Sequence, residues 1–175
     1  MNEELIGCVS VPNVFDDLTT EQVLTSQMVE GVHLDKVAEM DQTTRNHVAR
    51  LLLKVTVLEL FEWKFMQTDP NWGNFLFDSS KQVLHLIDFG ACRPYKKSFI
   101  DLYMELVWAS ANRDREKLAE VSQSLGFLTG QENEEMMNAH IDAGLVVGEP
   151  FYSDLPFDFA KSNMSQRLGK YGEIF

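Results

Sequence analysis

The chain has 175 residues, of which 45% are hydrophobic, so it is about one domain in length and can bury a sizeable core. Its formal net charge of −12 argues against a nucleic-acid partner, because nucleic-acid-binding proteins carry basic surfaces that neutralise phosphates. An anionic membrane would also repel the chain overall. The local basic cluster of Arg93, Lys96 and Lys97 is interpreted as a solvated face; the alternative is that it contacts phosphates or lipid headgroups.

The first predicted elements are strand-like stretches over residues 8–18 and 22–28. A helix follows, capped by Asp41 or Thr43 and running to about Met66. Its apolar residues recur at helical spacing, which predicts a buried core helix that supports the loop after it. These residues are Val48, Leu51, Leu52, Val55, Leu58, Phe61 and Phe65.

A β-hairpin is predicted next, with strands over residues 74–77 and 83–87 and a turn over residues 78–81. Such a hairpin would bring Asn74 and Asp88 towards one edge. Three further helices are predicted, and they span residues 98–112, 114–124 and 132–147. Gly126 and Gly130 mark the break between the last two, and the turn-rich residues 150–156 are the best candidate boundary. The predicted fold class is therefore α+β and mainly helical, with one small hairpin.

Other residue patterns exclude further classes of protein. Cys8 and Cys92 give neither a metal-ligand spacing nor a disulfide framework, and Cys92 is interpreted as a packing residue rather than a redox group. The four histidines are scattered along the chain and are interpreted as structural. No stretch reaches the ~20 apolar residues of a membrane span.

Two motifs near the middle of the chain carry the functional signal. Asp69 is followed by Asn74 in the segment D-P-N-W-G-N, and Asp88 begins a D-F-G tripeptide after an apolar run. This order and spacing is that of the protein-kinase signature, in which a catalytic Asp precedes a metal-binding Asn and the D-F-G Asp binds Mg²⁺. Coincidence is the alternative, but such a combination arises by chance in only about 1 of 1000 chains of this length.

The three residues suit phosphoryl transfer, which needs one carboxylate to orient the nucleophile and oxygen ligands to hold Mg²⁺ on the phosphates. Asp69 is the candidate catalytic residue, and Asn74 and Asp88 are the candidate metal and nucleotide ligands. Mg²⁺ prefers oxygen ligands and keeps several waters, so one amide oxygen and one carboxylate suffice beside the phosphates.

The chain departs from ordinary protein kinases around these motifs. Gln67 and Thr68 stand where His and Arg would precede the catalytic Asp, and Asn71 replaces a basic residue that is often found two positions after it. Without that Arg, a phosphorylated activation loop has no obvious partner. No A-P-E follows the D-F-G, so the usual peptide-docking segment is not expected.

The chain resembles the UbiB (ABC1-type) family of atypical kinases in two segments, Q-T-D-P-N-W-G-N (residues 67–74) and L-I-D-F-G-A (residues 86–91). The motif with a tryptophan at position 72 resembles the form of the motif found in the family's mitochondrial coenzyme Q branch. The similarity extends over about residues 8–160. It implies a protein kinase-like fold, binding of ATP or ADP with Mg²⁺, and ATPase activity that supports coenzyme Q (ubiquinone) biosynthesis.

The resemblance also implies partners and a location. Coenzyme Q biosynthetic proteins or lipid precursors are the implied partners, with peripheral membrane association on the matrix side of the mitochondrial inner membrane. Protein phosphorylation is not implied. Residues 1–4 do not resemble a transit peptide, so mitochondrial placement is an inference from the resemblance alone.

A complete kinase fold also needs a loop over the nucleotide phosphates and a strand Lys paired with a helix Glu. Neither can be identified, because Lys54 and Lys64 lie in a helical pattern and no G-x-G-x-x-G occurs; the family's K-x-G-Q motif and Ala-rich loop are absent too. We therefore expect a carboxy-terminal lobe with the amino-terminal lobe largely missing. The expected domains are a partial kinase-like domain over residues 1–160 and a disordered tail over residues 161–175.

Residues 28–31 would then form the hinge between the lobes. Backbone groups near Gln27 and Val29 can pair with adenine there, which makes both residues candidate nucleotide-binding positions. A plain strand end explains the segment about as well.

Two functional classes remain open. In the first, the chain belongs to an ATP-dependent kinase or ATPase in which Asp69 orients a water or substrate hydroxyl, Asn74 and Asp88 hold Mg²⁺, and the missing lobe completes the site. In the second, the chain is a non-catalytic, truncated lobe that acts as an interaction module, and the absent Lys and phosphate loop favour this class. We favour the first class, in which the chain belongs to an ATP-dependent kinase-like protein or ATPase.

Overall fold

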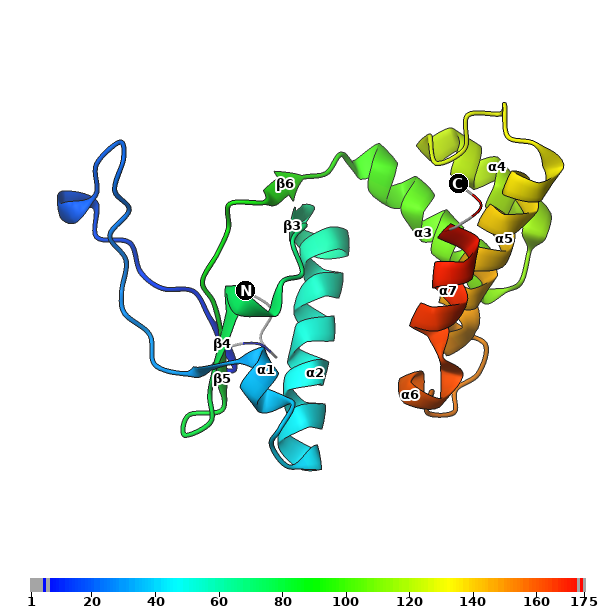
Figure 1. Cartoon of the computed structure of the whole chain (residues 1–175). Helices are drawn as coiled ribbons and strands as arrows, with labels where there is room; N and C mark the ends of the chain where they lie inside the picture. The colour runs from blue at the N-terminus through cyan, green and yellow to red at the C-terminus, as the bar shows by residue number, and fades with distance from the viewer. Residues whose placement is uncertain (1–4, 6, 173, 175) are drawn as a thin grey trace. The chain divides into compact units, whose positions relative to one another are not determined.

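The chain forms two compact units, Met1–Tyr95 and Lys96–Phe175, which are called the N-terminal and C-terminal units (Figure 1). The structure is a computed structural model that describes Leu5, residues 7–172 and Ile174. Its described part is mainly helical, as the sequence predicts, and it contains two small sheets where the sequence predicts one hairpin. None of the described helices is long and apolar enough to cross a membrane.

A four-stranded sheet organises the N-terminal unit, in the order β1-β5-β4-β2. β4 and β5 form the predicted antiparallel hairpin, and Phe75 lies opposite Leu86 at one end of it. β1 adds parallel to β5, and β2 adds antiparallel to β4. The bounds of the strands are Val9–Ser10 for β1, Val32–His33 for β2, Phe75–Asp78 for β4 and Val83–Leu86 for β5.

The turn of the hairpin is held by the side chain of Asp78. Its Oδ1 accepts hydrogen bonds from the backbone N–H groups of Ser80 and Lys81, at 2.9 and 3.1 Å, and from the Ser80 hydroxyl at 2.6 Å. These bonds, together with the Lys81 ammonium, hold the pKa of the Asp78 carboxyl well below its usual range. The closed turn fixes the hairpin register, so the two motifs lie together at its other end.

Helix α2 (Gln42–Leu58) covers the sheet and shares one hydrophobic core with it. Asp41 caps the helix as predicted, accepting from the backbone N–H of Thr44 at 3.0 Å. The short helix α1 (Leu34–Val37) precedes it. Apart from Leu5, which precedes β1, the core residues come from α1, α2 and the strands; the set is Leu5, Val9, Leu34, Val37, Val48, Leu51, Val55, Phe77, Leu84 and Leu86.

The end of this helix differs from the prediction. A π-helical turn, η3 (Glu59–Trp63), continues α2, and the helix ends at Trp63, because the next residue, Lys64, has a left-handed φ of 55°. The predicted end at Met66 is wrong because the next residues form strand β3 (Phe65–Gln67). β3 pairs antiparallel with β6 (Cys92–Pro94), and this long-range pairing overrides the local helical pattern.

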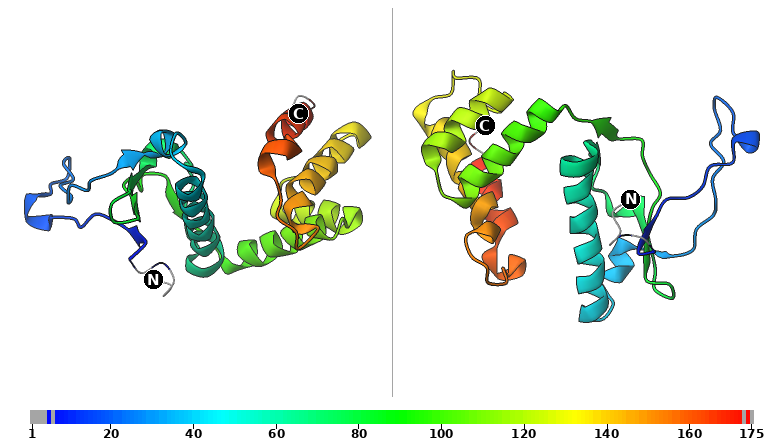
Figure 2. Two further views of the ribbon diagram at one scale, coloured as in Figure 1. Left: turned by 90° about the horizontal axis from the view of Figure 1, so that it is seen from below. Right: turned by 180° about the vertical axis from the view of Figure 1, so that it is seen from behind.

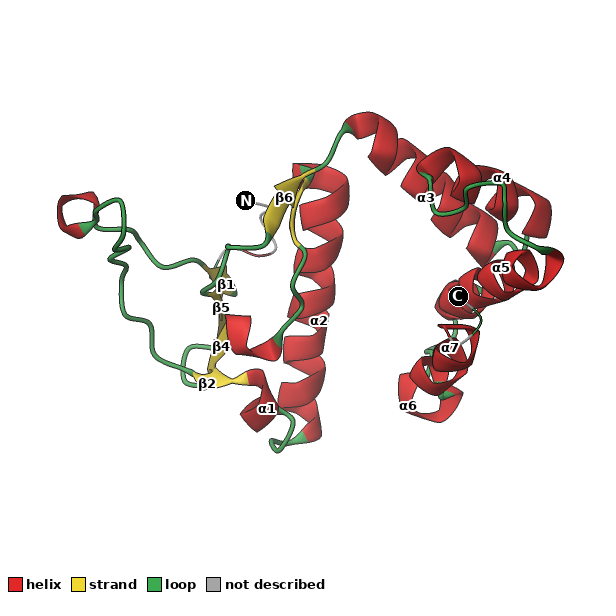
Figure 3. Cartoon of the chain, turned by 45° about the horizontal axis from the view of Figure 1, so that its top comes forward, coloured by secondary structure: helices red, strands yellow, loops and turns green. Residues whose placement is uncertain are grey.

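Residues 11–28 form an extended arm of the N-terminal unit, which both views of Figure 2 show leading away from the sheet. Figure 3 draws the arm mostly as loop, with the 3₁₀ helix η2 (Asp16–Leu18) near its tip. A single bridge pairs Val14 with Ser26. The two predicted strands are therefore confirmed only at β1 and at this bridge. Exposed apolar side chains of the arm are Val11, Val14, Phe15, Leu18, Val23, Leu24 and Met28.

The C-terminal unit is helical and agrees closely with the predicted helices. Ala109, Leu118 and Ile141 form its buried core, one from each of its three longest helices. The residues predicted to be a tail lie largely in the last helix, where the guanidinium of Arg167 binds both carboxylate oxygens of Glu149. The helices are α3 (Lys97–Ala111), α4 (Arg115–Leu125), α5 (Glu134–Gly148), η5 (Glu149–Phe151), α6 (Phe159–Ser162) and α7 (Met164–Gly172).

Candidate functional site

The two sequence motifs meet at the open end of the β4–β5 hairpin. The backbone N–H of Ile87 donates to the carbonyl oxygen of Asn74 at 3.0 Å, which extends the ladder by one bond beyond Phe75 and Leu86. Asn74 closes the 3₁₀ turn η4 (Trp72–Asn74), and Asp88 follows Ile87 directly. The hairpin therefore brings Asn74 and Asp88 to one edge, as the sequence predicts.

Asn74 is joined directly to Asp69. Its side-chain Nδ2 donates to the backbone oxygen and to Oδ2 of Asp69, both at 3.2 Å. Asn74 is buried, whereas Asp69 is exposed. Because the amide nitrogen is used by Asp69, the amide oxygen Oδ1 is the atom of this side chain that suits a cation.

Asp88 lies in a tight turn at the surface. Its Oδ1 accepts from the backbone N–H of Gly90 at 2.8 Å, and the residue is exposed. A carboxylate has about four acceptor positions, so this single bond leaves capacity for a metal ion. The Asp88 carboxylate is therefore held in one orientation, and its remaining lone pairs can bind a cation.

Gln67 connects the loop of Asp69 with the turn of Asp88. Its Nε2 donates to the backbone oxygen of Asp88 at 2.7 Å, and its Oε1 accepts from the backbone N–H of Asp69 at 3.0 Å. In the sequence, Gln67 marks a departure from the protein-kinase pattern and begins the segment that resembles the UbiB family, but this bridge is not predicted. Its position two residues before Asp69 was the available signal.

Thr68 makes a second connection between the same two segments. Its hydroxyl donates to the carbonyl oxygen of Ala91 at 2.7 Å, and its backbone N–H points to the same oxygen at 3.4 Å. The neighbouring residues, Gln67 and Cys92, pair with each other in the β3–β6 ladder. The loop before Asp69 is thus bonded to the chain on both sides of Phe89 and Gly90.

Two titratable groups lie beneath this loop. Burial raises the pKa of the Glu59 carboxyl, and a hydrogen bond from the backbone N–H of Gln67 opposes the rise. Burial also raises the pKa of the Cys92 thiol, with smaller contributions from the charges of Glu59 and Asp88. A thiol with a raised pKa is a poor nucleophile at neutral pH, which supports a packing role for Cys92.

The residues at the site fit a Mg²⁺ ion that is shared with phosphates. Asn74 offers an amide oxygen and Asp88 a carboxylate, and both are the hard oxygen donors that Mg²⁺ takes. Over the described part of the chain, no three His, Cys, Asp or Glu side chains gather into a metal cluster. An ion at this site would therefore need phosphate and water oxygens to complete its coordination.

Gln27 and Val29 are not bonded to the motif residues within the described structure. The backbone N–H of Gln27 donates to the carbonyl oxygen of Asn13 at 2.7 Å, inside the arm. Gly31 follows closely and lies so near β4 that a Cβ atom on it would come within 3.0 Å of the Phe77 backbone. The candidate hinge thus leads directly onto the strand that begins after Asn74.

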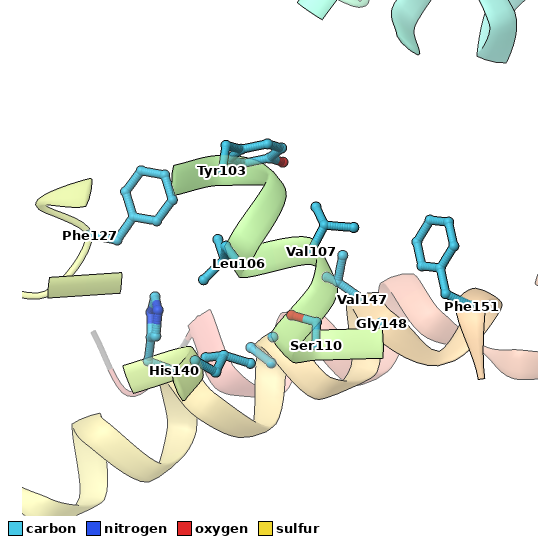
Figure 4. Close-up of a pocket in the computed structure, with 12 residues that line it drawn as sticks. Tyr103, Leu106, Val107, Ser110, Phe127, His140, Val147, Gly148 and Phe151 are labelled. Carbon is cyan, nitrogen blue, oxygen red and sulfur yellow. The ribbon is translucent and has the colours of Figure 1, made fainter. Parts of the chain in front are cut away.

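The C-terminal unit contains a separate, largely apolar pocket of about 320 Å³ (Figure 4). Leu106 and Val107 of α3 and His140 of α5 line it. The His140 Nε2 lies 2.9 Å from the Ser122 hydroxyl, and burial lowers the pKa of this imidazole. None of the described residues that line the pocket is acidic, so they offer no ligand set comparable with the motif residues.

Comparison with known proteins places the chain among atypical kinases. The family model described as "ABC1 atypical kinase-like domain" matches residues 2–122. The chain is 44% identical over 158 residues to "Atypical kinase COQ8B, mitochondrial" of Danio rerio, a match that covers 90% of this chain and 25% of that protein. It is 39% identical over 160 residues to "Atypical kinase COQ8, mitochondrial" of Saccharomyces cerevisiae, which covers 90% of this chain and 32% of the yeast protein.

A third relative carries a different name. The chain is 42% identical over 143 residues to "Probable serine/threonine-protein kinase abkA" of Dictyostelium discoideum, with 81% of this chain and 25% of that protein covered. The chain spans about a quarter to a third of the length of these relatives. The match to the family model confirms the resemblance carried by residues 67–74 and 86–91. The chain belongs to the ABC1 (UbiB) family of atypical kinase-like proteins.

Proposed function

We propose that the chain supplies the metal-binding side of a Mg²⁺–nucleotide site in a UbiB-type atypical kinase or ATPase that supports coenzyme Q biosynthesis. The observation that carries the proposal is that hydrogen bonds at one end of the hairpin join Asn74 to Asp69 and to Ile87, the residue directly before Asp88. An amide oxygen and a carboxylate held there match the ligands that Mg²⁺ needs on a nucleoside triphosphate.

Each residue has a distinct part in this proposal. Asn74 and Asp88 bind Mg²⁺, which neutralises charge on the phosphates when it is bound. Asp69 is exposed and accepts a hydrogen bond from Asn74, so its carboxylate is held near the metal ligands, where it orients a water or a substrate hydroxyl. Backbone groups near Gln27 and Val29 bind adenine, with Val29 as the better candidate because the Gln27 N–H is already bonded to Asn13.

In this proposal, residues 1–160 of the chain form the carboxy-terminal lobe of the kinase-like domain. The curated relatives are three to four times as long as the stretch matched here, as the covered shares of 25% and 32% indicate. A strand Lys and a phosphate-covering loop would come from such additional sequence. ATP or ADP is the proposed nucleotide.

The proposed cellular setting follows the names of the relatives. Those from Danio rerio and Saccharomyces cerevisiae are both named mitochondrial atypical kinases. We infer that this chain also acts in the mitochondrion, at the matrix side of the inner membrane. Coenzyme Q biosynthetic proteins or lipid precursors are the proposed partners.

A non-catalytic interaction module is the second candidate function. The arm of residues 11–28 favours it, because the side chains of Leu18, Leu24 and Met28 are 64%, 72% and 92% exposed. Exposed apolar side chains that are grouped in this way mark a surface for another protein segment. Nucleotide binding by the chain separates the two candidates.

The test is Mg²⁺-dependent ATP binding, measured by calorimetry on the chain and on its Asp88→Asn variant. The substitution removes one charged metal ligand but keeps an oxygen that can accept from the Gly90 N–H. We expect Mg²⁺–ATP affinity to fall by about tenfold or more, because the loss of one interaction with a charged group costs on the order of 1.5–3 kcal/mol.

Asp154→Asn is the matched control, since it makes the same change at an exposed position of the C-terminal unit. Unchanged affinity in the Asp88→Asn variant would refute the metal assignment. If neither the unsubstituted chain nor the variant binds Mg²⁺–ATP, the interaction module becomes the better account.

A further inference from the structure

We propose that Gln67 is the positioning residue of this site and that its amide holds Asp69 and Asp88 in the relative arrangement that Mg²⁺–nucleotide binding requires. The inference rests on the proposed function and assigns a part to a residue outside the predicted ligand set. It is carried by the two hydrogen bonds of one side chain, to Asp88 and to Asp69.

The two bonds use both ends of the amide. Nε2 donates to the Asp88 carbonyl at 2.7 Å, and Oε1 accepts from the Asp69 N–H at 3.0 Å. The side chain therefore sets the spacing between a backbone acceptor of one motif and a backbone donor of the other. A side chain with only a donor or only an acceptor cannot make both contacts.

The surroundings keep Gln67 in place. It is 8% exposed, it ends strand β3, and it pairs with Cys92 of β6. Its own backbone N–H is bonded to the buried Glu59 carboxylate. Hydrogen bonds that are shielded from water in this way are stronger than exposed ones. When one partner is lost, the other polar group stays buried without a hydrogen bond, which costs free energy.

Thr68 strengthens the same connection from the neighbouring position. Gln67 holds the turn at Asp88, and Thr68 holds it three residues later at Ala91. The exposed Asp88 carboxylate thus lies on a short segment that is fixed at both ends. Gln67 acts on the metal site through this segment, without being a ligand itself.

The sequence offers a chemical comparison for the role. Gln67 occupies the position of His in the H-R-D pattern of ordinary protein kinases. A neutral imidazole also has one donor and one acceptor nitrogen, so it can make the same pair of contacts. A leucine has neither, and an ionised glutamate has acceptors only.

The experiment compares nucleotide affinity with and without Mg²⁺ in Gln67→Leu, Gln67→Glu and Gln67→His, with Asp88→Asn measured alongside. We expect Gln67→Leu and Gln67→Glu to lower Mg²⁺–ATP affinity by about tenfold while Mg²⁺-free affinity changes by less than about twofold. Gln67→His is expected to restore most of the Mg²⁺-dependent affinity. Circular dichroism checks that each variant is folded, and Gln67→Glu carries the test if Gln67→Leu is not.

Gln82→Leu is the matched control. Gln82 donates to the Ser79 carbonyl at 2.7 Å in the turn at the far end of the same hairpin, and its substitution is expected to leave both affinities unchanged. A merely structural role for Gln67 would lower both affinities together, and this result would overturn the inference. So would normal Mg²⁺–ATP affinity in folded Gln67→Leu or Gln67→Glu.

Asp88→Asn keeps the inference apart from the function on which it rests. If Asp88→Asn weakens Mg²⁺–ATP binding and the Gln67 variants do not, the positioning role is wrong and the metal site stands. If Asp88→Asn has no effect, or the unsubstituted chain shows no Mg²⁺-dependent binding, the proposed function fails and the role of Gln67 fails with it.

Discussion

Glu59 is a buried carboxyl in the N-terminal unit, placed under the loop that carries Asp69. It is 8% exposed and lies in the π-helical turn that ends α2. Its hydrogen bond from the Gln67 backbone only partly compensates for burial, so its pKa is raised. The folded state therefore binds the Glu59 proton more tightly than the unfolded state does.

This raised pKa predicts how stability changes with pH. The stability contributed by Glu59 is fully present below the unfolded-state pKa and is lost as pH rises through the folded-state pKa. Glu59→Gln keeps an acceptor for the Gln67 N–H and cannot ionise. We expect this variant to gain stability relative to the unsubstituted chain as pH rises from about 4, near the unfolded-state pKa of a Glu carboxyl, to about 8, measured by urea denaturation.

Glu62→Gln, on the exposed side of the same turn, is the control for this measurement. A constant stability difference between Glu59→Gln and the unsubstituted chain across the pH range would contradict the prediction. Such a result would mean that the Glu59 carboxyl is equally solvated in both states.

At this scale, the sequence could locate Asp69, Asn74 and Asp88 but not Gln67. The first three belong to a spaced motif, and the hairpin between Asn74 and Asp88 could be recognised from its two short apolar strands and the turn residues that join them. The role of Gln67 depends on its bond to Asp88, which lies 21 residues away. Side-chain contacts over that separation follow from the β3–β6 pairing, which no local pattern revealed.

Among the elements, α5 packs closely against α3 at its last residue, Gly148. A Cβ atom on Gly148 would lie 2.6 Å from the backbone carbon and oxygen of Ser110. Real Cβ atoms do not approach backbone atoms so closely, so the two helices can meet here only because the residue is a glycine.

Gly148→Ala is therefore expected to destabilise the C-terminal unit by about 1–3 kcal/mol, because overpacking a close contact between helices forces the backbone apart. Denaturant unfolding followed by circular dichroism measures the change. Gly169→Ala is the control: it makes the same substitution in α7, where the added Cβ has no neighbour within 4 Å. Equal stability of the Gly148→Ala variant and the unsubstituted chain would show that the contact is looser than described.

The helices of the C-terminal unit could be predicted because their signals are local. Asp114 and Asn133 cap α4 and α5 by accepting from backbone N–H groups three residues later, at 3.0 and 2.9 Å. Strand β3 could not be predicted in this way, since its pairing of Phe65 with Pro94 joins residues that are far apart in sequence. The helical pattern in the sequence therefore predicts an end at about Met66, three residues beyond the observed end at Trp63.

For the whole molecule, the proposed metal ligands and the proposed catalytic residue Asp69 lie within one compact unit, Met1–Tyr95. The same unit carries the arm of residues 11–28, whose strand-like composition does not produce a long strand pair. A strand forms only where a partner supplies backbone hydrogen bonds, and in the arm those bonds are limited to a few, such as Phe15 N–H to the Thr25 carbonyl at 2.9 Å. The apolar residues of the arm remain exposed as a result.

At the proposed site, Asn74 and Asp88 together hold the divalent ion of a nucleotide complex. The most direct test replaces Mg²⁺ with Mn²⁺ in the presence of ADP and measures paramagnetic broadening of backbone amide signals by NMR. We predict the strongest broadening around Asn74 and Asp88, and its loss in the Asp88→Asn variant. Broadening centred on other acidic positions, such as Asp16 and Asp17 in the arm, would contradict this account of the site.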